Sequence, residues 1–471
     1  MVDAVVVGAG PNGLTAAITL AEAGLAVLVL EANPTPGGGA RTEERTLPGV
    51  RHDVCSAVHP FGVASPAFTA MSLGEHGLRW VHPEIPFAHP LDGGRAAAVT
   101  RDLEETCERL GADGPAWRRT VGWLVRHWEE SARLAMSPPL HALRRPIFGS
   151  GFGWRALRSA AMLVRRFRTA EGRASIAGLA AHSAAPLTTI ASAGVAISLG
   201  ASAHTVGWPV AAGGSGAITE ALVGKLRSLG GEIRVGTRVE QWSDIPEAAV
   251  VVLATGRETA IAIAGDRMSS WRRGRYRSLP RGPGVFKIDV ALAGPIPWSN
   301  EDCRRAGTLH LGGTYEEIAE SERTVTDGEP PARPFVVAAQ PTVADGSRAP
   351  NGTHVLWAYC RVPRGSTVDM TGAIVRQVER FAPGFESRII GLSARSAGDL
   401  EADNANLVGG DITGGALSWR GLFARPTLFR PYRAARRVYL GSASTPPGAG
   451  VHGMCGWHAA HAALRDLRSG R

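Results

Sequence analysis

The chain has 471 residues, of which 44% are hydrophobic and 20% charged, a balance that excludes a disordered protein and indicates about two or three folded domains. Its formal net charge of +9 comes almost entirely from arginine, because Lys225 and Lys287 are the only lysines. No basic block with interleaved aromatic residues resembles a nucleic-acid module, so nucleic acid is not expected as a partner.

The cysteines, the first residues and the longest apolar stretch bear on the cellular compartment. The five cysteines are scattered and form no CxxC pair, so neither a disulfide framework nor a metal site is expected. The first expected strand starts at Val2 and leaves no room for a signal peptide. The stretch from Ile190 to Ile218 is broken by glycines and a proline, which indicates buried helix and loop rather than a membrane span. These features favour a protein of the reducing cytoplasm.

The first 30 residues predict a βαβ unit. Residues 4–7 are apolar, as in a central parallel strand, and residues 14–23 have a helical pattern that ends at Gly24. A second buried strand is expected over residues 26–30, and Glu31 follows it directly. The unit has the usual length of a βαβ crossover.

A glycine motif joins the first strand to the helix. It reads Gly8-Ala9-Gly10-Pro11-Asn12-Gly13. In this position a GxGxxG motif indicates a dinucleotide site, because its glycines allow a tight turn, close approach of a pyrophosphate and close helix packing. The helix N-terminus offers N–H groups to the phosphates. Glu31, 18 residues after Gly13, is suited to bind ribose hydroxyls and to repel a 2′-phosphate, which makes a purely structural glycine loop the weaker interpretation.

Residues from about 70 to 200 are expected to be mainly helical. Within them Trp154, Leu157, Ala161, Val164 and Phe167 recur at helical spacing among arginines, which predicts a basic amphipathic helix over 154–168. Such a helix suits peripheral contact with an anionic membrane, and it suits equally a solvated helix on the outside of a domain. Both interpretations stay open.

The rest of the chain predicts further α/β structure and a second domain. A helix is expected over 214–229, strands over 232–235 and 250–254, and a strand, a glycine-rich turn and a helix over 438–467. Shorter alternating runs at 285–290, 335–339 and 354–359 predict a mixed sheet. We expect two interleaved domains: a Rossmann-like dinucleotide-binding domain from 1–70, 205–285 and 427–471, and an α+β substrate domain from 71–204 and 286–426.

A second glycine cluster after Glu31 identifies the cofactor class. Residues 36–42 read Pro-Gly-Gly-Gly-Ala-Arg-Thr, and together with the first motif they resemble the FAD family that includes monoamine oxidases, protoporphyrinogen oxidases and carotenoid desaturases. The resemblance implies non-covalent FAD, with Arg41 and the glycines along its pyrophosphate and ribityl chain. Arginine suits this role because its fork can pair with phosphate.

The C-terminal segment resembles the flavin-closing motif of phytoene-desaturase-type proteins. Ser442 stands where other branches of the superfamily carry Asp, and Gly450 and Val451 would bring N–H groups near the pyrimidine side of the flavin. With residues 51–60, 404–415 and 425–426, the whole chain resembles the bacterial phytoene-dehydrogenase-like family, which includes the pyridine nucleotide–disulfide oxidoreductase-domain-2 proteins.

This resemblance implies a set of FAD contacts spread over the chain. Val239 is the expected backbone contact to adenine, and residues 254–256 are expected near the pyrophosphate. The expected contacts are Gly8, Gly10, Pro11, Asn12, Gly13, Glu31, Ala32, Gly38, Gly39, Arg41, Thr42, Val239, Ala254, Thr255, Gly256, Gly441, Ser442, Gly450 and Val451.

Two histidines are the candidate catalytic residues. His59 and His452 lie in segments expected near the isoalloxazine ring, and histidine can move a proton near neutral pH. A hydrogen-bonded structural role is the alternative for each. Asp53 and Asp411 are bases or turn residues in the same neighbourhoods, and Cys455 is interpreted as a core residue rather than a covalent flavin link.

The resemblance implies an FAD-dependent oxidoreductase of the desaturase or dehydrogenase type. A hydride would move from a C–C or C–N bond of a lipophilic or natural-product substrate to FAD. Two alternatives stay open: a reductase or saturase that uses NAD(P)H, and a non-catalytic prenyl-binding protein on the same fold. The intact Gly8, Gly10, Gly13, Glu31 and Arg41 argue against the second alternative.

Overall fold

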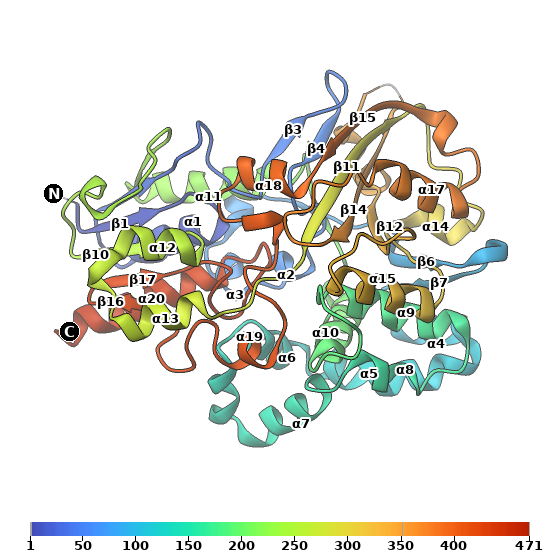
Figure 1. Cartoon of the computed structure of the whole chain (residues 1–471), viewed down its shortest axis with the longest axis horizontal. Coiled ribbons are helices and arrows are strands. Elements are labelled where there is room, and N and C mark those ends of the chain that lie inside the picture. The colour runs from blue at the N-terminus through green and yellow to red at the C-terminus, as the bar shows by residue number, and fades with distance from the viewer. Residues whose placement is uncertain (1, 351, 471) are drawn as a thin grey trace.

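The computed structural model describes residues 2–350 and 352–470, and it contains two large sheets. The sheets lie side by side along the long axis of the molecule, and each is covered by its own helices (Figure 1). Both chain termini lie at the end of the molecule that holds the smaller sheet. Within the described ranges, no helix combines the length and apolarity needed to span a membrane.

The smaller sheet is the Rossmann-like one. Its strand order is β16 (Arg433–Ala435), β17 (Val438–Leu440), β10 (Val250–Leu253), β1 (Ala4–Val7), β2 (Val27–Leu30) and β9 (Glu232–Arg234). All neighbours pair in parallel except β16, which is antiparallel to β17. Every residue of β1, β2 and β10 is buried, as parallel strands covered on both faces require.

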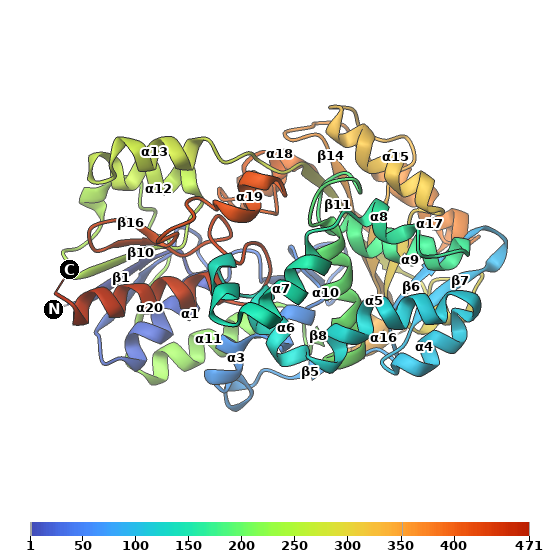
Figure 2. The ribbon, with the colours of Figure 1, turned by 90° about the horizontal axis from the view of Figure 1, so that it is seen from below.

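Helices cover both faces of this sheet (Figure 2). On one face α1 (Pro11–Glu22), α11 (Gly216–Ser228) and α20 (Met454–Arg468) pack against alternate strand residues such as Val6 and Val29. On the other face α12 (Arg257–Ala264) and α13 (Ser270–Arg277) pack against residues such as Val5 and Leu28. Because successive side chains point to opposite faces of a strand, the sheet contributes to two separate hydrophobic cores.

The larger sheet has seven strands. Their order is β15 (Ile389–Arg395), β11 (Gly284–Leu292), β14 (His354–Val362), β13 (Val336–Ala339), β12 (Ala306–Leu311), β6 (Ile85–Pro90) and β7 (Ala96–Val99). Only β12 and β6 pair in parallel. One face packs against α5 (Gly114–Arg126), α9 (Ala170–Ala181), α10 (Ser192–Thr205) and α15 (Tyr315–Thr326), and the other against α14 (Glu301–Arg305) and α17 (Thr371–Phe381).

Shorter elements complete the fold. Two small sheets pair β3 (Thr42–Glu44) with β4 (Arg51–Asp53) and β5 (Trp80–Val81) with β8 (Val210–Ala211). The remaining α-helices are α2 (Pro60–Val63), α3 (Pro66–Ala70), α4 (Leu103–Arg109), α6 (Trp128–Ala135), α7 (Pro146–Ala156), α8 (Ala160–Val164), α16 (Pro341–Ala344), α18 (Ala397–Asp403) and α19 (Trp419–Phe423).

The predicted α/β class with a Rossmann-like unit is confirmed. The region from 70 to 200 is mainly helical, as expected, and it also contributes β6 and β7, which form a hairpin in the large sheet. The sequence of β6 hides its strand character, since Pro86 and Pro90 interrupt it and prolines usually exclude a residue from a sheet.

The prediction of a single amphipathic helix over 154–168 is wrong. Helix α7 ends at Ala156, and α8 starts at Ala160 with the Ser159 hydroxyl accepting from the Met162 N–H at 3.4 Å. A serine N-cap competes with continuation of a helix, which explains the break. Trp154 is 70% exposed, whereas Val164 and Phe167 are buried in the core of the larger half.

Candidate dinucleotide-binding site

The glycine motif between β1 and α1 has a backbone that only glycine supports. Gly8 has φ +101°, and a Cβ there would lie 3.1 Å from the Ala254 carbonyl oxygen. A Cβ at Gly13 would overlap the Gly8 carbonyl oxygen. The two glycines therefore allow the turn and bring the N-terminus of α1 tightly against the sheet.

Glu31 ties the end of β2 to this turn. Its carboxylate is buried and accepts the Ala9 N–H at 2.7 Å and the Asn33 N–H at 2.9 Å. Its backbone also accepts the Thr237 N–H at 2.7 Å, which brings the segment after β9 alongside. Carboxylate oxygens have further lone pairs, so Glu31 can accept from ribose hydroxyls in this position.

The second glycine cluster folds back onto the first. Gly37, with φ +126°, donates its N–H to the Ala9 carbonyl at 2.9 Å. Gly38, with φ +54°, lies so close that a Cβ on it would be 3.2 Å from the Gly10 Cα. The two loops thus form one glycine-lined cradle that a single added side chain would fill.

Arg41 and Thr42 leave this cradle at its far end. The Arg41 side chain is largely buried, with Nε 3.5 Å from a Glu43 carboxylate oxygen and Nη2 3.9 Å from Asp403. The Thr42 hydroxyl donates to Asp53 at 2.8 Å and accepts the Gly216 N–H at 2.9 Å. Thr42 therefore fixes the strand after the cradle to α11, and Arg41 retains a guanidinium edge for a phosphate.

Val239 and residues 254–256 occupy two other edges of the site. Among the described residues, neither the N–H nor the C=O of Val239 makes a hydrogen bond, although its residue is 7% exposed. An unpaired backbone donor and acceptor in this setting suit the edge of an adenine base. Gly256 donates its N–H to Asn406 Oδ1 at 2.6 Å, which holds the segment after β10 against a segment from the larger half.

The C-terminal motif packs directly on the N-terminus of α1. Gly441 follows β17 and donates its N–H to the Leu253 carbonyl at 2.9 Å. A Cβ at Gly456 would overlap the Asn12 carbonyl oxygen, and the buried Asn12 Oδ1 atom has no hydrogen-bond partner within residues 2–350 and 352–470. The Ser442 hydroxyl accepts the Ser444 N–H at 3.3 Å.

The predicted cofactor residues therefore meet at one edge of the small sheet. Gly8, Glu31, Ala254 and Gly441 follow the carboxyl ends of β1, β2, β10 and β17, which is where doubly wound sheets bind dinucleotides. Gly450, with φ +144°, and Val451 lie just before α20. The glycine cradle, the unpaired Val239 backbone and the orphan Asn12 oxygen are consistent with a bound dinucleotide.

The two candidate catalytic histidines differ in their environments. Both imidazoles are buried, and burial lowers the pKa of each to about 4. His452 Nδ1 accepts the Met454 N–H at 3.0 Å, and its ring also bonds to the Ala449 backbone. His59 has no hydrogen-bond partner at either ring nitrogen among the described residues. The structural alternative thus describes His452 well, whereas His59 keeps both nitrogens available.

His59 and His452 come from segments that meet. Gly62 lies between them, since a Cβ there would be 3.0 Å from the Val451 carbonyl oxygen and 3.2 Å from the His59 Cβ. Ser65 donates its hydroxyl to the His452 carbonyl at 2.6 Å. The His59 segment is therefore held beside the turn that precedes α20.

Asp53 and Asp411 both have structural partners. Asp53 is fully buried, accepts the Ser215 N–H at 2.7 Å and pairs with Arg348 at 2.8 Å. Burial alone would raise the pKa of Asp53, but Arg348 and the Ser215 N–H lower it below its usual range. Asp411 accepts the Gly282 N–H at 3.0 Å and the Thr413 hydroxyl at 2.6 Å, as a turn-stabilising carboxylate does.

Sequence reasoning missed a buried ionic cluster beside the cradle. Lys287 and Asp289 form a close ion pair inside β11, and His52 Nδ1 lies 3.6 Å from Asp289. Burial lowers the pKa of Lys287, and Asp289 opposes that shift. The sequence carries a signal for this cluster, because Lys287 is one of two lysines and, with Asp289, interrupts an apolar strand.

Cys55 connects this cluster to the glycine cradle. A Cβ at Gly39 would lie 3.4 Å from the Cys55 sulfur. Burial raises the pKa of the Cys55 thiol, and the nearby Arg395, Lys287 and Arg41 oppose that shift. Lys287 therefore lies in the large sheet at the point where it approaches the cradle.

Aromatic residues fill the face of the large sheet that is turned toward α9 and α10. The buried members are Phe87, Trp208, Phe335, Trp357 and Tyr359, and Trp357 Nε1 has no hydrogen-bond partner among the residues that the structure describes. Val58 and Phe61, on either side of His59, pack against the same cluster. The His59 segment therefore borders both the cradle and an aromatic interior.

The sequence predicts neither a metal site nor a covalent link between Cys455 and a flavin. Residues 2–350 and 352–470 contain no group of three or more His, Cys, Asp or Glu side chains arranged to hold a metal ion. The buried Cys455 thiol lies 3.3 Å from the Gly448 carbonyl and 3.5 Å from the Thr445 carbonyl.

Comparison with known proteins agrees with this geometry. Residues 6–71 match the model of the NAD(P)-binding Rossmann-like domain. The rat pyridine nucleotide-disulfide oxidoreductase domain-containing protein 2 is 26% identical over 556 aligned positions, covering 99% of this chain and 94% of the relative. The lycopene-forming phytoene desaturase of a Paracoccus species is 25% identical over 282 positions, covering 55% of this chain and 56% of the relative.

Solved structures share the fold along the whole chain. An oxidoreductase from Methanosarcina mazei superposes with a TM-score of 0.66 and 16% identity, covering 98% of this chain and all of the other. Putrescine oxidase bound to putrescine superposes with a TM-score of 0.63 and 17% identity, covering 99% of each chain.

The fold, the site and these relatives define the class. The chain is an oxidoreductase with a Rossmann-like domain, and its cofactor is a flavin or another nucleotide. The resemblance to the phytoene-dehydrogenase-like family is confirmed: the similarity extends to carotenoid desaturases over half of the chain and to pyridine nucleotide-disulfide oxidoreductase domain-containing protein 2 over nearly all of it.

Proposed function

We propose that the chain is a desaturase- or dehydrogenase-type oxidoreductase that binds FAD non-covalently in the glycine cradle. The contact between Gly10 and Gly38 beside Glu31 carries this proposal. A nicotinamide site needs only the first glycine motif, whereas here a second glycine loop and a buried arginine extend the cradle beyond it. The extra length suits the ribityl chain and ring of a flavin.

The proposed division of labour follows the two sheets. The cofactor domain comprises 1–70, 205–285 and 427–471, which supply all six strands of the smaller sheet. The substrate domain comprises 71–204 and 286–426, which supply the larger sheet apart from the first two residues of β11. The reaction zone lies where the His59 segment and Lys287 meet the cradle.

When bound, FAD supplies a two-electron acceptor for a hydride. The residues of this chain position the substrate, exclude water and provide a group that accepts the proton. The aromatic interior around Trp357 and Tyr359 excludes water and aligns an apolar substrate. The aromatic composition of this interior favours a lipophilic or natural-product substrate. The Paracoccus relative, a lycopene-forming phytoene desaturase, favours the same class of substrate. His59, uncharged at neutral pH and without a partner, can accept the substrate proton.

An absorption spectrum of the purified protein tests the cofactor, and anaerobic addition of NADH or NADPH tests the direction of the reaction. We expect flavin bands that neither nucleotide bleaches, together with release of free FAD on acid denaturation because the link is non-covalent. Prompt bleaching by a nucleotide would establish a reductase or saturase instead. A colourless protein that FAD cannot reconstitute would favour a non-catalytic binding protein.

For the partner surface, we propose peripheral membrane contact through α7 and the turn after it. Helix α7 lies at the lower margin of the molecule in Figure 1. Ile147 and Trp154 on this helix are 89% and 70% exposed, and Leu143, which precedes it, is 74% exposed. Arg158 stacks over Trp154 at 4.4 Å, so a cation accompanies the apolar tip. Aromatic and aliphatic tips flanked by arginine suit the interface of an anionic bilayer.

Vesicle sedimentation tests this contact. Ile147→Glu and Trp154→Glu should each reduce binding to phosphatidylglycerol vesicles several-fold. In each variant a carboxylate replaces apolar surface that would enter the bilayer, and the anionic headgroups repel it. Val368→Glu is the matched control, since Val368 is a 44% exposed loop residue of the same half. Equal losses in all three variants, or no binding by the parent protein, would refute the contact.

A further inference from the structure

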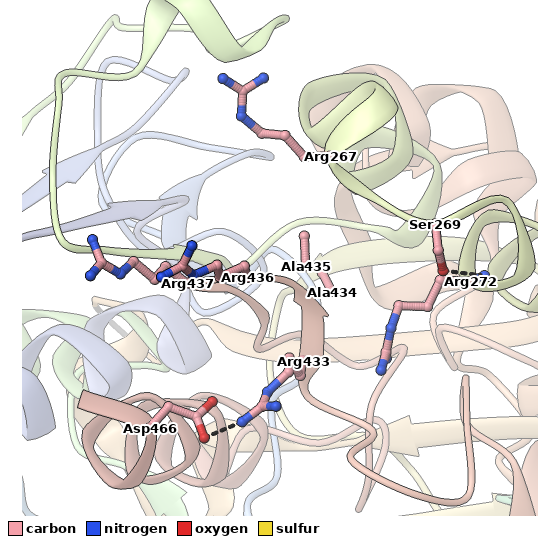
Figure 3. A pocket seen from close by; sticks show the side chains of 9 residues that line it. All are labelled: Arg267, Ser269, Arg272, Arg433, Ala434, Ala435, Arg436, Arg437 and Asp466. Atoms are coloured by element: carbon pink, nitrogen blue, oxygen red, sulfur yellow. Dashed lines mark hydrogen bonds and ion pairs between the residues drawn. The ribbon is translucent and has the colours of Figure 1, made fainter. Parts of the chain in front are cut away.

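A basic cavity lies at the opposite end of the small sheet from the glycine cradle. It measures about 400 Å³ and lies between α13 and the hairpin of β16 and β17 (Figure 3). Five arginines and one acid line it, namely Arg267, Arg272, Arg433, Arg436, Arg437 and Asp466. The hairpin precedes β17, whose carboxyl end faces the cradle, so this cavity is separate from the dinucleotide site.

The cations of this cavity are only partly neutralised. Arg433 pairs with Asp466, which also accepts the Tyr439 hydroxyl at 2.7 Å. Arg267 lies over the Trp242 ring at 4.3 Å. Among the described residues, no carboxylate lies within ion-pairing distance of Arg272, Arg436 or Arg437. Four positive charges therefore remain in excess around the cavity.

Arg272 is the cation of this cavity that has a buried, unpaired nitrogen. Its side chain extends from α13 toward Arg433 (Figure 3), and its buried Nη1 atom has no hydrogen-bond partner in the described part of the chain. Burial lowers the pKa of Arg272; the nearby Tyr276 opposes that shift, and Arg433 and Arg430 add to it. A guanidinium held beside like charges without an acid is an arrangement that a bound anion would stabilise.

The hairpin keeps two further arginines at the mouth of the cavity at a conformational cost. Arg437 has φ +61°, a left-handed conformation that asparagine or glycine adopts more easily at a hairpin turn. Ser269, at the N-terminus of α13, faces the same space. Basic side chains do protect sheet edges, but that role needs neither a half-buried arginine whose Nη1 atom is buried nor a concave surface.

We propose that this cavity binds a phosphoryl group, as inorganic pyrophosphate or as the diphosphate of a nucleotide. Arginine forks match phosphate oxygens in pairs, and a cavity of about 400 Å³ exceeds what a single phosphate fills. Arg272 would supply the buried contact, and Arg436 and Arg437 would close over the exposed side. The site lies away from the proposed redox centre, so it is a second ligand site on the cofactor domain.

Calorimetric titration with pyrophosphate, and separately with ADP, tests the proposal on the FAD-saturated protein at 150 mM salt. Arg272→Gln should weaken pyrophosphate binding roughly 10- to 100-fold, as loss of a charge-assisted contact does. Arg436→Gln, at an exposed position that folding does not need, should weaken it several-fold. Arg275→Gln is the matched control, because it removes the same charge from the same helix outside the cavity lining.

Tighter binding of ADP than of pyrophosphate, with the same loss in Arg272→Gln, would identify a nucleotide as the source of the phosphoryl group. Equal affinities would identify the free diphosphate. Absence of binding, or an equal loss in Arg275→Gln, would overturn the proposal in favour of a diffuse basic surface. Flavin content is measured on every variant, so failure of the FAD site is recognised separately.

Discussion

Gly456 is the most sensitive test of how the C-terminal helix supports the cofactor site. It lies in the first turn of α20, and a Cβ there would overlap the Asn12 carbonyl oxygen at the start of α1. In Gly456→Ala the two helices must separate by a substantial fraction of a carbon radius. The displaced backbone is the one whose N–H groups face the expected pyrophosphate.

Two opposing contributions set the magnitude. Replacing a helical glycine by alanine stabilises a helix by up to about 1 kcal/mol, whereas overpacking a tight contact costs about 1–3 kcal/mol. Because the contact is with backbone on a buried helix, we expect the overpacking to win and the variant to lose about 1–2 kcal/mol. Gly274→Ala in α13 supplies the control, since nothing lies within 4 Å of its Cβ position and it should gain stability.

Urea unfolding and the release of FAD on dilution measure the two effects. Gly456→Ala should unfold at lower urea than the parent and release FAD faster, and Gly274→Ala should unfold at slightly higher urea with unchanged release. If both variants shift in the same direction, the close contact between α20 and α1 does not support the site, and the reasoning from the glycine pattern fails.

Three further changes probe the site. Glu31→Gln should weaken FAD binding roughly 10- to 100-fold in a fluorescence titration, because a charged acceptor for Ala9 and the ribose is lost, and unchanged affinity would count against the ribose role. Lys287→Met should cost about 3–5 kcal/mol by leaving the Asp289 carboxylate buried and unpaired, and adding Asp289→Asn should recover most of that loss in urea unfolding. The unfolding free energy should fall as the pH is lowered from 6.5 to 4, because the folded pKa of His59 is about 4 and the unfolded chain binds the proton first. His59→Gln should flatten this dependence by up to about 1.4 kcal/mol per pH unit. An unaltered slope would show that His59 is not buried as an uncharged ring.

Much of the small sheet could be predicted from sequence because its signals are local. Apolar runs predict β1, β2 and β10, and Gly8 and Gly13 mark the tight turn between β1 and α1, where a Cβ on Gly13 would overlap the Gly8 carbonyl oxygen. The glycine doublet after Glu31 is also local, so its contact with Gly10 follows from the length of the intervening chain. Periodicity and turn chemistry therefore suffice for the cofactor half.

The larger half was less predictable because its elements depend on distant partners. The strand β6 contains two prolines, and its parallel partner β12 (Ala306–Leu311) is distant in the sequence. The end of α7 before Ser159 depends on how α8 packs into the core through Leu163 and Val164. Neither the strand β6 nor the end of α7 is marked by a hydrophobic period in the sequence.

The ionic cluster at Lys287 shows the same limit of local reasoning at the site itself. The charges of Lys287 and Asp289 are visible in sequence, but their proximity to His52 depends on how β11 lies against β4. A two-residue spacing puts both side chains on one face of the strand. That face is the one turned to Cys55 and the cradle, and sequence alone does not say which face a strand turns inward.

The interleaving of the two halves has a physical reason. The chain leaves the small sheet after β2 and after β10, and both strands end at the edge where the cradle lies. An insertion that starts there is placed over the cofactor rather than beside the sheet, and its returning segment can contact the site again. Asn406 does so, because its side-chain oxygen accepts the Gly256 N–H at 2.6 Å. Substitution of Asn406 by alanine would therefore remove the hydrogen-bond acceptor of Gly256, itself one of the expected cofactor contacts, and loosen this junction between the halves without changing the side chain of any expected cofactor contact.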